Sequence, residues 1–274
     1  MMRTLNRKKR KKFGQHFLKD EYVAEKIVSF ADVRQDETVL EIGPGKGILT
    51  SILLSQAQKV IAVEIDDELI RYLKRRFSKA QNLCLIHKDF LKYDLSILSE
   101  KIKVIGNLPY NIGTRIIMHI INFRERFSNV IFMLQKEVAE RLVASPGTKD
   151  YGSLSIFIQL YFYGEILMNI PPESFSPPPK VFSTIVNLEP KKQLFGQFDN
   201  PELFHKIVKL AFSHRRKKLR NNLKALPLGD YDMKEISLET GIDLGLRGEM
   251  LSIKEYLRLT QSVSRFIRKG DVTH

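Results

Sequence analysis

Short apolar runs and helically spaced apolar positions take turns along the first two thirds of the chain. Uninterrupted apolar runs predict buried strands, whereas apolar residues three or four positions apart predict helices that pack by one face. On this basis we predict strands at 38–42, 59–64, 83–90, 102–108, 129–135 and 182–188, and helices over 21–33, 47–57, 67–80, 114–122 and 136–145. This order is typical of an α/β fold, with a doubly wound parallel sheet covered by helices on both faces.

The pattern changes in the last third of the chain. An apolar and aromatic stretch, 146–170, predicts one more helix and strand, and five of the eleven prolines then fall within 171–179, which indicates a rigid loop. Beyond this loop and the strand after it, the apolar spacing is helical and no further strand run occurs. We therefore predict two domains, an α/β domain over 1–194 with a basic N-terminal tail and a small all-helical domain over 195–274.

Positive charge is concentrated in two segments. The formal net charge is +14, with seven basic residues and no acid in 3–12 and six basic residues and no acid in 214–224. Two focused basic segments favour binding of a polyanion such as RNA. The alternatives are a solvated tail and a solvated helix face. The candidate RNA-binding residues are Arg7, Lys8, Lys9, Arg10, Lys11, Arg215, Arg216, Lys217, Lys218 and Arg220.

Other features narrow the class of protein. Cys84 is the only cysteine, so the chain forms no internal disulfide, which suits a reducing compartment. The sequence has no apolar signal segment and no apolar run long enough to cross a bilayer. The six histidines show no spacing typical of metal ligands. We expect a cytoplasmic monomer with no membrane partner and no metal site.

A glycine-rich turn follows the first predicted strand. Gly43, Gly45 and Gly47 stand between strand and helix, where backbone N–H groups at a helix start can approach a ligand. Their spacing is not the G-x-G-x-x-G of dinucleotide-binding proteins. Glu41, two residues earlier, would lie unfavourably close to a pyrophosphate but suits a ligand with a cationic amino acid portion. The turn therefore favours S-adenosyl-L-methionine over NAD.

The next two strands also end in acids. Glu64, with Ile65 after it, stands where a carboxylate can accept hydrogen bonds from ribose hydroxyls. Asp89 can accept from an adenine amine, with Phe90 beside the ring. Each acid alone is equally explained as a helix cap or a solvated loop residue. Together, at the carboxyl edge of a doubly wound sheet, they predict one cofactor site.

The fourth strand ends in Asn107, Leu108, Pro109 and Tyr110. Asn107 offers a side-chain carbonyl, Pro109 stiffens the turn, and Tyr110 offers an aromatic face. An isolated segment of this kind is often only a proline turn with a core tyrosine.

The motifs taken together resemble a known family. FGQHFL, VLEIGPGKGILT, EID, KDF, GNLPYNI, KEVAERL and SFSPPPKVFS occur in the order and spacing of the ribosomal RNA adenine N6-dimethyltransferases. PGTKDYGSLSI and HRRKKLRNNLK are most similar to the small-subunit enzymes. The resemblance covers about residues 10–225 and implies a Rossmann-like methyltransferase sheet. It also implies contacts to S-adenosyl-L-methionine from His16, Leu18, Gly43, Glu64, Asp89 and Asn107, although the family usually has asparagine where this chain has His16.

The resemblance further implies how the target base is held. The Asn107 side-chain carbonyl and the Leu108 backbone carbonyl would accept the two N–H bonds of an adenine N6 and aim its lone pair at the methyl group. Tyr110 would stack on the extruded base, and Phe175 would form the opposing wall.

The function that the resemblance implies is N6 dimethylation of two adjacent adenosines in a hairpin near the 3′ end of small-subunit (16S) ribosomal RNA, during ribosome maturation. The partner would be this RNA within the small ribosomal subunit or its precursor. One alternative is a large-subunit RNA methyltransferase of the macrolide-resistance type, which PGTKDYGSLSI and the basic C-terminal domain disfavour. Another is a non-catalytic ribosome-assembly factor, which Glu64, Asp89 and the Asn107 segment disfavour.

Overall fold

The computed structural model describes residues 16–98, 101–192 and 200–270. The chain divides into two compact units: one runs to Ala139 and includes Phe162–Pro190, and the other comprises Glu140–Tyr161 and the residues from Lys191 onward. The division differs from the predicted boundary between residues 194 and 195, because the segment Glu140–Tyr161 belongs with the C-terminal helices.

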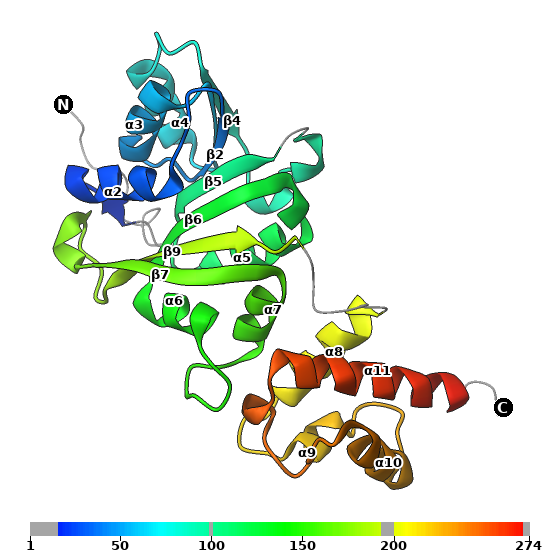
Figure 1. Ribbon diagram of the computed structural model, residues 1–274. Coiled ribbons are helices and arrows are strands. Elements are labelled where there is room, and N and C mark those ends of the chain that lie inside the picture. The colour runs from blue at the N-terminus through cyan, green and yellow to red at the C-terminus, as the bar shows by residue number, and fades with distance from the viewer. Residues whose placement is uncertain (1–15, 99–100, 193–199, 271–274) are drawn as a thin grey trace. The chain divides into compact units, whose positions relative to one another are not determined.

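The first unit is built on a seven-stranded sheet, counted over the described residues. Five parallel strands lie in the order β4-β3-β2-β5-β6, and β9 and β7 complete the sheet beyond β6 (Figure 1). Only β9 runs against its neighbours, pairing antiparallel with β6 and β7. The strands are β2 (Thr38–Ile42), β3 (Lys59–Glu64), β4 (Leu83–His87), β5 (Ile102–Asn107), β6 (Phe127–Gln135), β7 (Phe162–Ile170) and β9 (Ser183–Pro190). The predicted α/β fold is confirmed.

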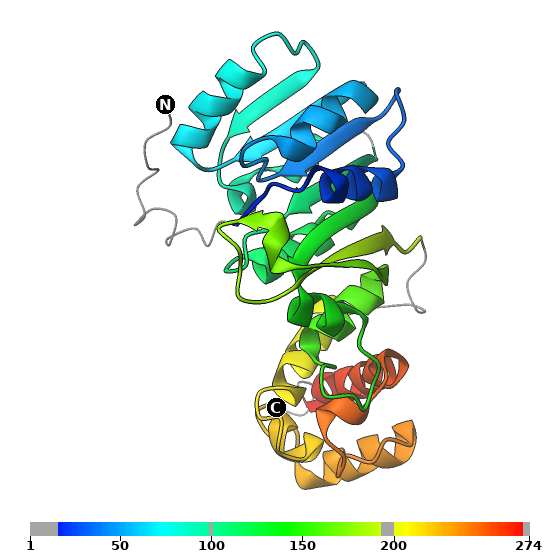
Figure 2. The same ribbon diagram turned by 90° about the vertical axis from the view of Figure 1, so that its left-hand side faces the viewer.

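Helices cover both faces of this sheet. α2 (Glu21–Ala31) lies beside α3 (Ile48–Gln56) on one face, as both ribbon views show (Figures 1 and 2). α5 (Gly113–Asn122) lies on the other face, since a Cβ on Gly113 would stand 3.4 Å from the side chain of Leu134, which alternates with Met133 of the α2 face. α4 (Asp67–Arg76) and α6 (Lys136–Val143) follow β3 and β6.

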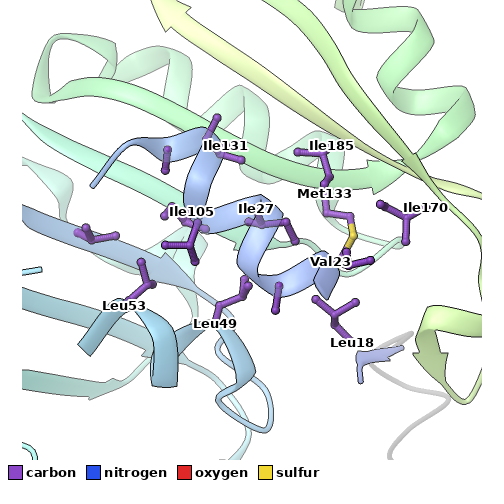
Figure 3. Close-up of a cluster of buried hydrophobic side chains, with 14 of the residues drawn as sticks. Leu18, Val23, Ile27, Leu49, Leu53, Ile105, Ile131, Met133, Ile170 and Ile185 are labelled. Carbon is purple, nitrogen blue, oxygen red and sulfur yellow. The ribbon is translucent and has the colours of Figure 1, made fainter. Parts of the chain in front are cut away.

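The face under α2 and α3 holds a continuous apolar core. Ile27 and Leu53 point from the two helices onto Ile105 and Ile131 of β5 and β6, and all four are fully buried (Figure 3). Removing each such side chain from water contributes about 1.5–3 kcal/mol. This core fixes the strands whose ends carry the candidate site.

A small second sheet places the N-terminal segment. β1 (Phe17–Leu18) pairs antiparallel with β8 (Phe175–Ser176), and Lys19 N donates to Ser174 O at 2.9 Å. The Asp20 side chain then caps α2 by accepting from Val23 N, and its other oxygen accepts from the Ser174 hydroxyl. His16, directly before β1, is thereby held in a defined place.

The second unit is helical. It contains α7 (Ser153–Tyr161), α8 (Pro201–Ala211), α9 (Leu219–Leu223), α10 (Asp230–Thr240) and α11 (Ile253–Gly270). The Tyr151 hydroxyl donates to Leu251 O at 3.1 Å, and Gly147 N donates to Glu249 O at 2.8 Å. These bonds explain why the segment before α7 belongs with the C-terminal helices. None of the helices within the described ranges is long and apolar enough to cross a membrane.

The second basic segment is not one continuous helix. α8 ends at Ala211 and the short α9 begins only at Leu219, so most of the basic residues lie in the turn between them. The Asn222 side chain stabilises this turn by donating to Ala211 O at 2.8 Å and to His214 O at 3.2 Å.

Candidate active site

A cavity of about 280 Å³ lies at the carboxyl ends of β2, β3, β4 and β5. Parallel strands end at the same edge of a sheet, so the functional groups that follow them are brought together. The predicted residues that line the cavity are His16, Leu18, Glu41, Gly43, Gly45, Glu64, Ile65, Asp89, Phe90, Asn107, Leu108, Pro109 and Tyr110. Phe175 is not among the lining residues.

The turn between β2 and α3 depends on its glycines. Gly43, Gly45 and Gly47 have φ angles of 65°, 57° and 78°, a region that side chains other than glycine rarely adopt. A Cβ on Gly47 would stand 2.6 Å from the Phe77 ring, so this glycine lets α3 start close to α4. A Cβ on Gly43 would meet no described atom within 4 Å. Gly43 therefore leaves bare backbone along open cavity space.

Glu41 carries a buried carboxyl group with one oxygen unused. Its Oε2 accepts from the Thr50 hydroxyl at 2.6 Å, but its Oε1 is buried with no hydrogen-bond partner among the described residues. Burial raises the pKa of Glu41 to about 7, and the nearby carboxylate of Glu64 adds to the rise. The unpaired oxygen of a buried carboxyl group needs a hydrogen-bond donor, and a cationic donor also compensates the negative charge. The residue fits the ammonium group of a ligand in the cavity.

Glu64 is held rigidly at the end of β3. Its Oε1 accepts from Ile65 N at 2.9 Å and Asp66 N at 3.0 Å, and its Oε2 accepts from Gly45 N at 3.2 Å. Burial raises the pKa of Glu64, and these three N–H bonds oppose the rise. Four lone-pair sites are available on a carboxylate, so one site on Oε2 is left for a hydroxyl donor. The prediction that Glu64 receives a ribose is compatible with this geometry.

Asp89 and Phe90 line the cavity just after the end of β4. Asp89 Oδ1 accepts from Leu91 N at 3.0 Å, which fixes the carboxylate. The buried Phe90 ring packs edge-on against His119 of α5, with the ring centroids 5.7 Å apart. Ile65 lines the same cavity and is 43% exposed. An apolar side chain beside a fixed acceptor suits a flat ring with an amine.

Asn107 ends β5 with its side-chain carbonyl oxygen available as an acceptor. Its Nδ2 donates to the His16 backbone carbonyl at 3.2 Å, and this bond orients the amide. Leu108 N donates to Met133 O at 3.1 Å, which fixes the next peptide. The side chain of Leu108 is buried. The segment therefore presents side-chain and backbone acceptors from a rigid strand end.

Tyr110 is half-buried and fixed at two points. Its hydroxyl shares a hydrogen bond with the Ser183 hydroxyl at 2.7 Å, and its ring lies 5.2 Å from the His16 ring at an interplanar angle of 33°. Burial raises the pKa of Tyr110, so the hydroxyl stays protonated. The ring is a candidate stacking surface at the cavity wall.

The position of Phe175 does not match its predicted role. Its side chain is 1% exposed and belongs to the apolar core with Val23, Met133 and Ile185. A base cannot stack on a ring that other side chains already cover on both faces. Phe175 stabilises the pairing of β1 with β8, where it stands opposite Leu18.

The predicted RNA-binding residues differ in their surroundings. Arg7, Lys8, Lys9, Arg10 and Lys11 lie outside the described residues. Arg215 Nη2 donates to Lys149 O and Tyr151 O, both at 2.8 Å, and its Nε lies 3.5 Å from Glu249 Oε2. Arg215 therefore has a structural role within its unit. The remaining candidates, Arg216, Lys217, Lys218 and Arg220, are exposed.

Sequence reasoning missed several residues of the cavity wall. Lys46, Lys88 and Arg115 line the cavity beside the predicted residues. Each lies within five positions of a predicted residue, so proximity in the sequence was the available signal. No group of three or more potential metal ligands occurs in the parts of the chain that the structure describes.

The fold is that of a Rossmann-like protein, and the cavity at the ends of its parallel strands has a lining that suits a nucleoside-containing ligand. The family model described as ribosomal RNA adenine dimethylase matches residues 6–264, and the chain belongs to this family.

Curated relatives extend over nearly the whole chain. It is 43% identical over 261 residues to the ribosomal RNA small subunit methyltransferase A of Nitrosospira multiformis, a match that covers 95% of this chain and 98% of the relative. It is 40% identical over 256 residues to the protein of the same name from Clostridium botulinum (strain Kyoto), covering 92% and 93%.

Two solved structures of RNA-modifying enzymes are similar to most of this chain. A dimethyladenosine transferase from Plasmodium falciparum is similar with a TM-score of 0.78 at 29% identity, covering 93% of this chain and 98% of that one. The 23S rRNA methyltransferase ErmE is similar with a TM-score of 0.69 at 25% identity, covering 90% and 99%.

Proposed function

We propose that this protein transfers methyl groups from S-adenosyl-L-methionine to N6 of adenosines in small-subunit ribosomal RNA and produces N6,N6-dimethyladenosine. The observation that carries the proposal is the orientation of Asn107, whose amide donates to His16 O and so leaves its carbonyl oxygen to accept. The small-subunit relatives at 40–44% identity support this substrate over the large-subunit alternative. The site of action that we propose is the cytoplasm.

Different cavity residues would contact different parts of the cofactor. When bound, S-adenosyl-L-methionine supplies an electrophilic methyl group on a sulfonium. Glu41 Oε1, which lacks a partner among the described residues, would accept from the ammonium group of the amino acid portion. Glu64 would accept from the ribose, and Asp89 from the adenine amine, with Ile65 along the ring.

Asn107 and Leu108 would prepare the nucleophile. The lone pair of an adenine N6 is delocalised into the ring, which makes this nitrogen a poor nucleophile. Two acceptors, the Asn107 side-chain carbonyl and the Leu108 backbone carbonyl, would draw the two N–H bonds out of the ring plane and free the lone pair. Catalysis would then depend on positioning, which is worth up to about 7–11 kcal/mol in well-oriented reactions.

Tyr110 would hold the target base outside its helix. Extruding a base costs roughly a few kcal/mol, and stacking on an aromatic ring returns about 1–3 kcal/mol. The hydrogen bond between the Tyr110 and Ser183 hydroxyls helps to orient the ring. Exposed cations of the second unit, Lys217 among them, would contact RNA phosphates and position the substrate.

Two adjacent adenosines of a hairpin near the 3′ end are the substrate that we propose within the small subunit or its precursor. The protein should be incubated with labelled S-adenosyl-L-methionine and, separately, with small and large ribosomal subunits that lack adenine dimethylation. We expect label in the small subunit only, at two neighbouring adenosines that yield dimethyladenosine after digestion. Label in the large subunit alone would refute the proposal.

Asn107→Ala tests the catalytic role directly. We expect the single-turnover rate to fall by about 10²–10³-fold, the usual loss for one oriented polar contact in an active site. Binding of S-adenosyl-homocysteine, measured by calorimetry, should weaken far less than in Glu64→Ala. Full dimethylation by Asn107→Ala at the wild-type rate would contradict the mechanism.

A further inference from the structure

Three cationic side chains line the cavity, and they differ in their surroundings. They belong to Lys46, Lys88 and Arg115. The Lys46 ammonium lies over the Phe17 ring, 5.2 Å from its centroid, and the charge of Lys88 acts on the nearby carboxylate of Asp94. Arg115 is exposed, and its guanidinium forms no hydrogen bond or ion pair with any described residue. This cation is therefore available to a ligand.

The backbone of Arg115 is fixed relative to the turn that carries Tyr110. Ile112 N and Gly113 N both donate to Pro109 O, at 3.2 and 2.9 Å, so α5 continues directly from this turn. Four buried isoleucines anchor α5 on the sheet, and its first turn contains no acid. Arg115 is thus carried by a regular helix, and no carboxylate of its own turn competes for the guanidinium.

The cofactor offers Arg115 no anion. S-adenosyl-L-methionine has positive charges on its sulfonium and ammonium groups, and its negative charge is the carboxylate of the amino acid portion. The proposed function assigns that portion to Glu41, whereas the adenosyl portion, assigned to Asp89, carries no charge. α5 packs on the adenosyl side, because its His119 ring contacts the Phe90 ring at a centroid distance of 5.7 Å. A cation in the first turn of α5 therefore needs a partner from elsewhere.

The RNA substrate brings such a partner. An extruded adenosine stays attached to a phosphate on each side of its ribose, so a base stacked on Tyr110 carries phosphates to the cavity. Arginine suits this group because its planar guanidinium donates two parallel hydrogen bonds to phosphate oxygens. We propose that Arg115 is a positioning residue for the extruded nucleotide and binds a backbone phosphate next to the target adenosine. This role rests on the proposed function.

A contact to the target nucleotide has a different effect from contacts to flanking RNA. Flanking phosphates are bound whether or not the base is extruded, so they contribute to affinity alone. The Arg115 contact forms only when the nucleotide enters the cavity. It therefore stabilises the reactive state over the other bound states and raises the rate as well as the affinity.

Three variants separate the charge of Arg115 from its shape. Arg115→Gln removes the charge, and Arg115→Lys keeps the charge without the planar fork. Arg71→Gln is the matched control, because Arg71 is an exposed arginine of α4 that does not line the cavity. The substrate is the small ribosomal subunit that lacks adenine dimethylation.

Binding to the subunits is measured against salt concentration, and methylation is measured in single turnover at saturating subunits. We expect Arg115→Gln to reduce the slope of log K against log salt by about 0.7–0.9, the value of one phosphate contact. Its rate should fall about tenfold, the value of one hydrogen bond to a charged group. Arg115→Lys should keep the wild-type slope with an intermediate rate, and Arg71→Gln should match wild type in rate.

Binding of S-adenosyl-homocysteine, measured by calorimetry, should be the same in all four proteins. Weaker binding in parallel with a lower rate would place Arg115 on the cofactor side and overturn the proposal. A wild-type rate in Arg115→Gln would also overturn it, whether or not the salt slope changes. A wild type that binds with an Arg115-dependent slope but does not methylate would refute the proposed function alone.

The phosphate is located with subunits reconstituted on RNA in which a neutral methylphosphonate replaces one linkage beside a target adenosine. At the linkage that Arg115 binds, we expect this replacement to slow wild type about tenfold and Arg115→Gln not at all, because both changes remove the same contact. Multiplicative losses at the linkages on both sides of both target adenosines would overturn the proposal.

Discussion

Protonation of Glu41 should make stability depend on pH in a direction opposite to that of an ordinary salt-bridged acid. In the unfolded chain this carboxyl has its usual pKa of 4.5, and in the folded protein burial raises the pKa to about 7. Between these values the unfolded chain releases the proton and the folded protein keeps it. The contribution of Glu41 to stability therefore falls as pH rises through this window and is constant above it.

The size of the effect follows from the difference between the two pKa values. Each unit of difference between the two pKa values corresponds to about 1.4 kcal/mol. Ionisation of Glu41 therefore lowers the free energy of unfolding by about 3 kcal/mol between pH 4.5 and pH 7.5. Glu41→Gln keeps an acceptor for the Thr50 hydroxyl and carries no charge. We expect the free energy of unfolding of this variant, relative to that of wild type, to rise by about 3 kcal/mol between pH 4.5 and pH 7.5.

The assay is urea unfolding of wild type and Glu41→Gln from pH 4.5 to 8, with Glu25→Gln, an exposed carboxylate of α2, as the control. Saturating S-adenosyl-homocysteine should flatten the wild-type profile, since its ammonium group favours the charged carboxyl, and should bind Glu41→Gln more weakly. Parallel stability profiles for wild type and Glu41→Gln would refute the reasoning.

Three further sets of substitutions test other parts of the molecule. Tyr110→Phe keeps the stacking ring and should lower the methylation rate by less than about fivefold, whereas Tyr110→Ala should lose about 5- to 150-fold, the value of one stacked base; equal losses would indicate a role for the hydroxyl. Replacing Arg216 and Lys217 with glutamine should weaken RNA binding and reduce its salt dependence by about one phosphate contact per residue, and an unchanged salt slope would exclude the turn between α8 and α9 from the interface. Gly47→Ala should lower the free energy of unfolding by about 1–3 kcal/mol, because φ is 78° and the new Cβ meets Phe77, and a wild-type urea midpoint would contradict this.

The sequence predicted the cavity well because its residues follow strands. Glu41, Glu64, Asp89 and Asn107 each stand at or just after an apolar run, and parallel strands place such positions at one edge. Strand periodicity and chain order were therefore sufficient to bring together groups that are far apart in the sequence.

Features that depend on packing between distant segments were not predictable in this way. The hydrophobic pattern of β9 is that of any buried strand and does not indicate its direction. Only its pairing with β6 and β7 shows that it runs antiparallel. Phe175 was predicted from the family resemblance and Arg215 from its place in a basic segment, but Phe175 is covered by the core and Arg215 is bonded to Lys149 O and Tyr151 O. Periodicity contains no information about which surface a side chain finds on another segment.

The division of the chain also limits how the protein can be cut or recombined. The backbone passes from one unit to the other after Ala139, after Tyr161 and after Pro190, so three connections join them. A fragment that begins at Lys191 would lack α7, whose Ile156, Ile158 and Leu160 are fully buried. Exchange of the helical unit between relatives would therefore require grafting two separate stretches of gene, and a single crossover point would leave an apolar helix without its partners.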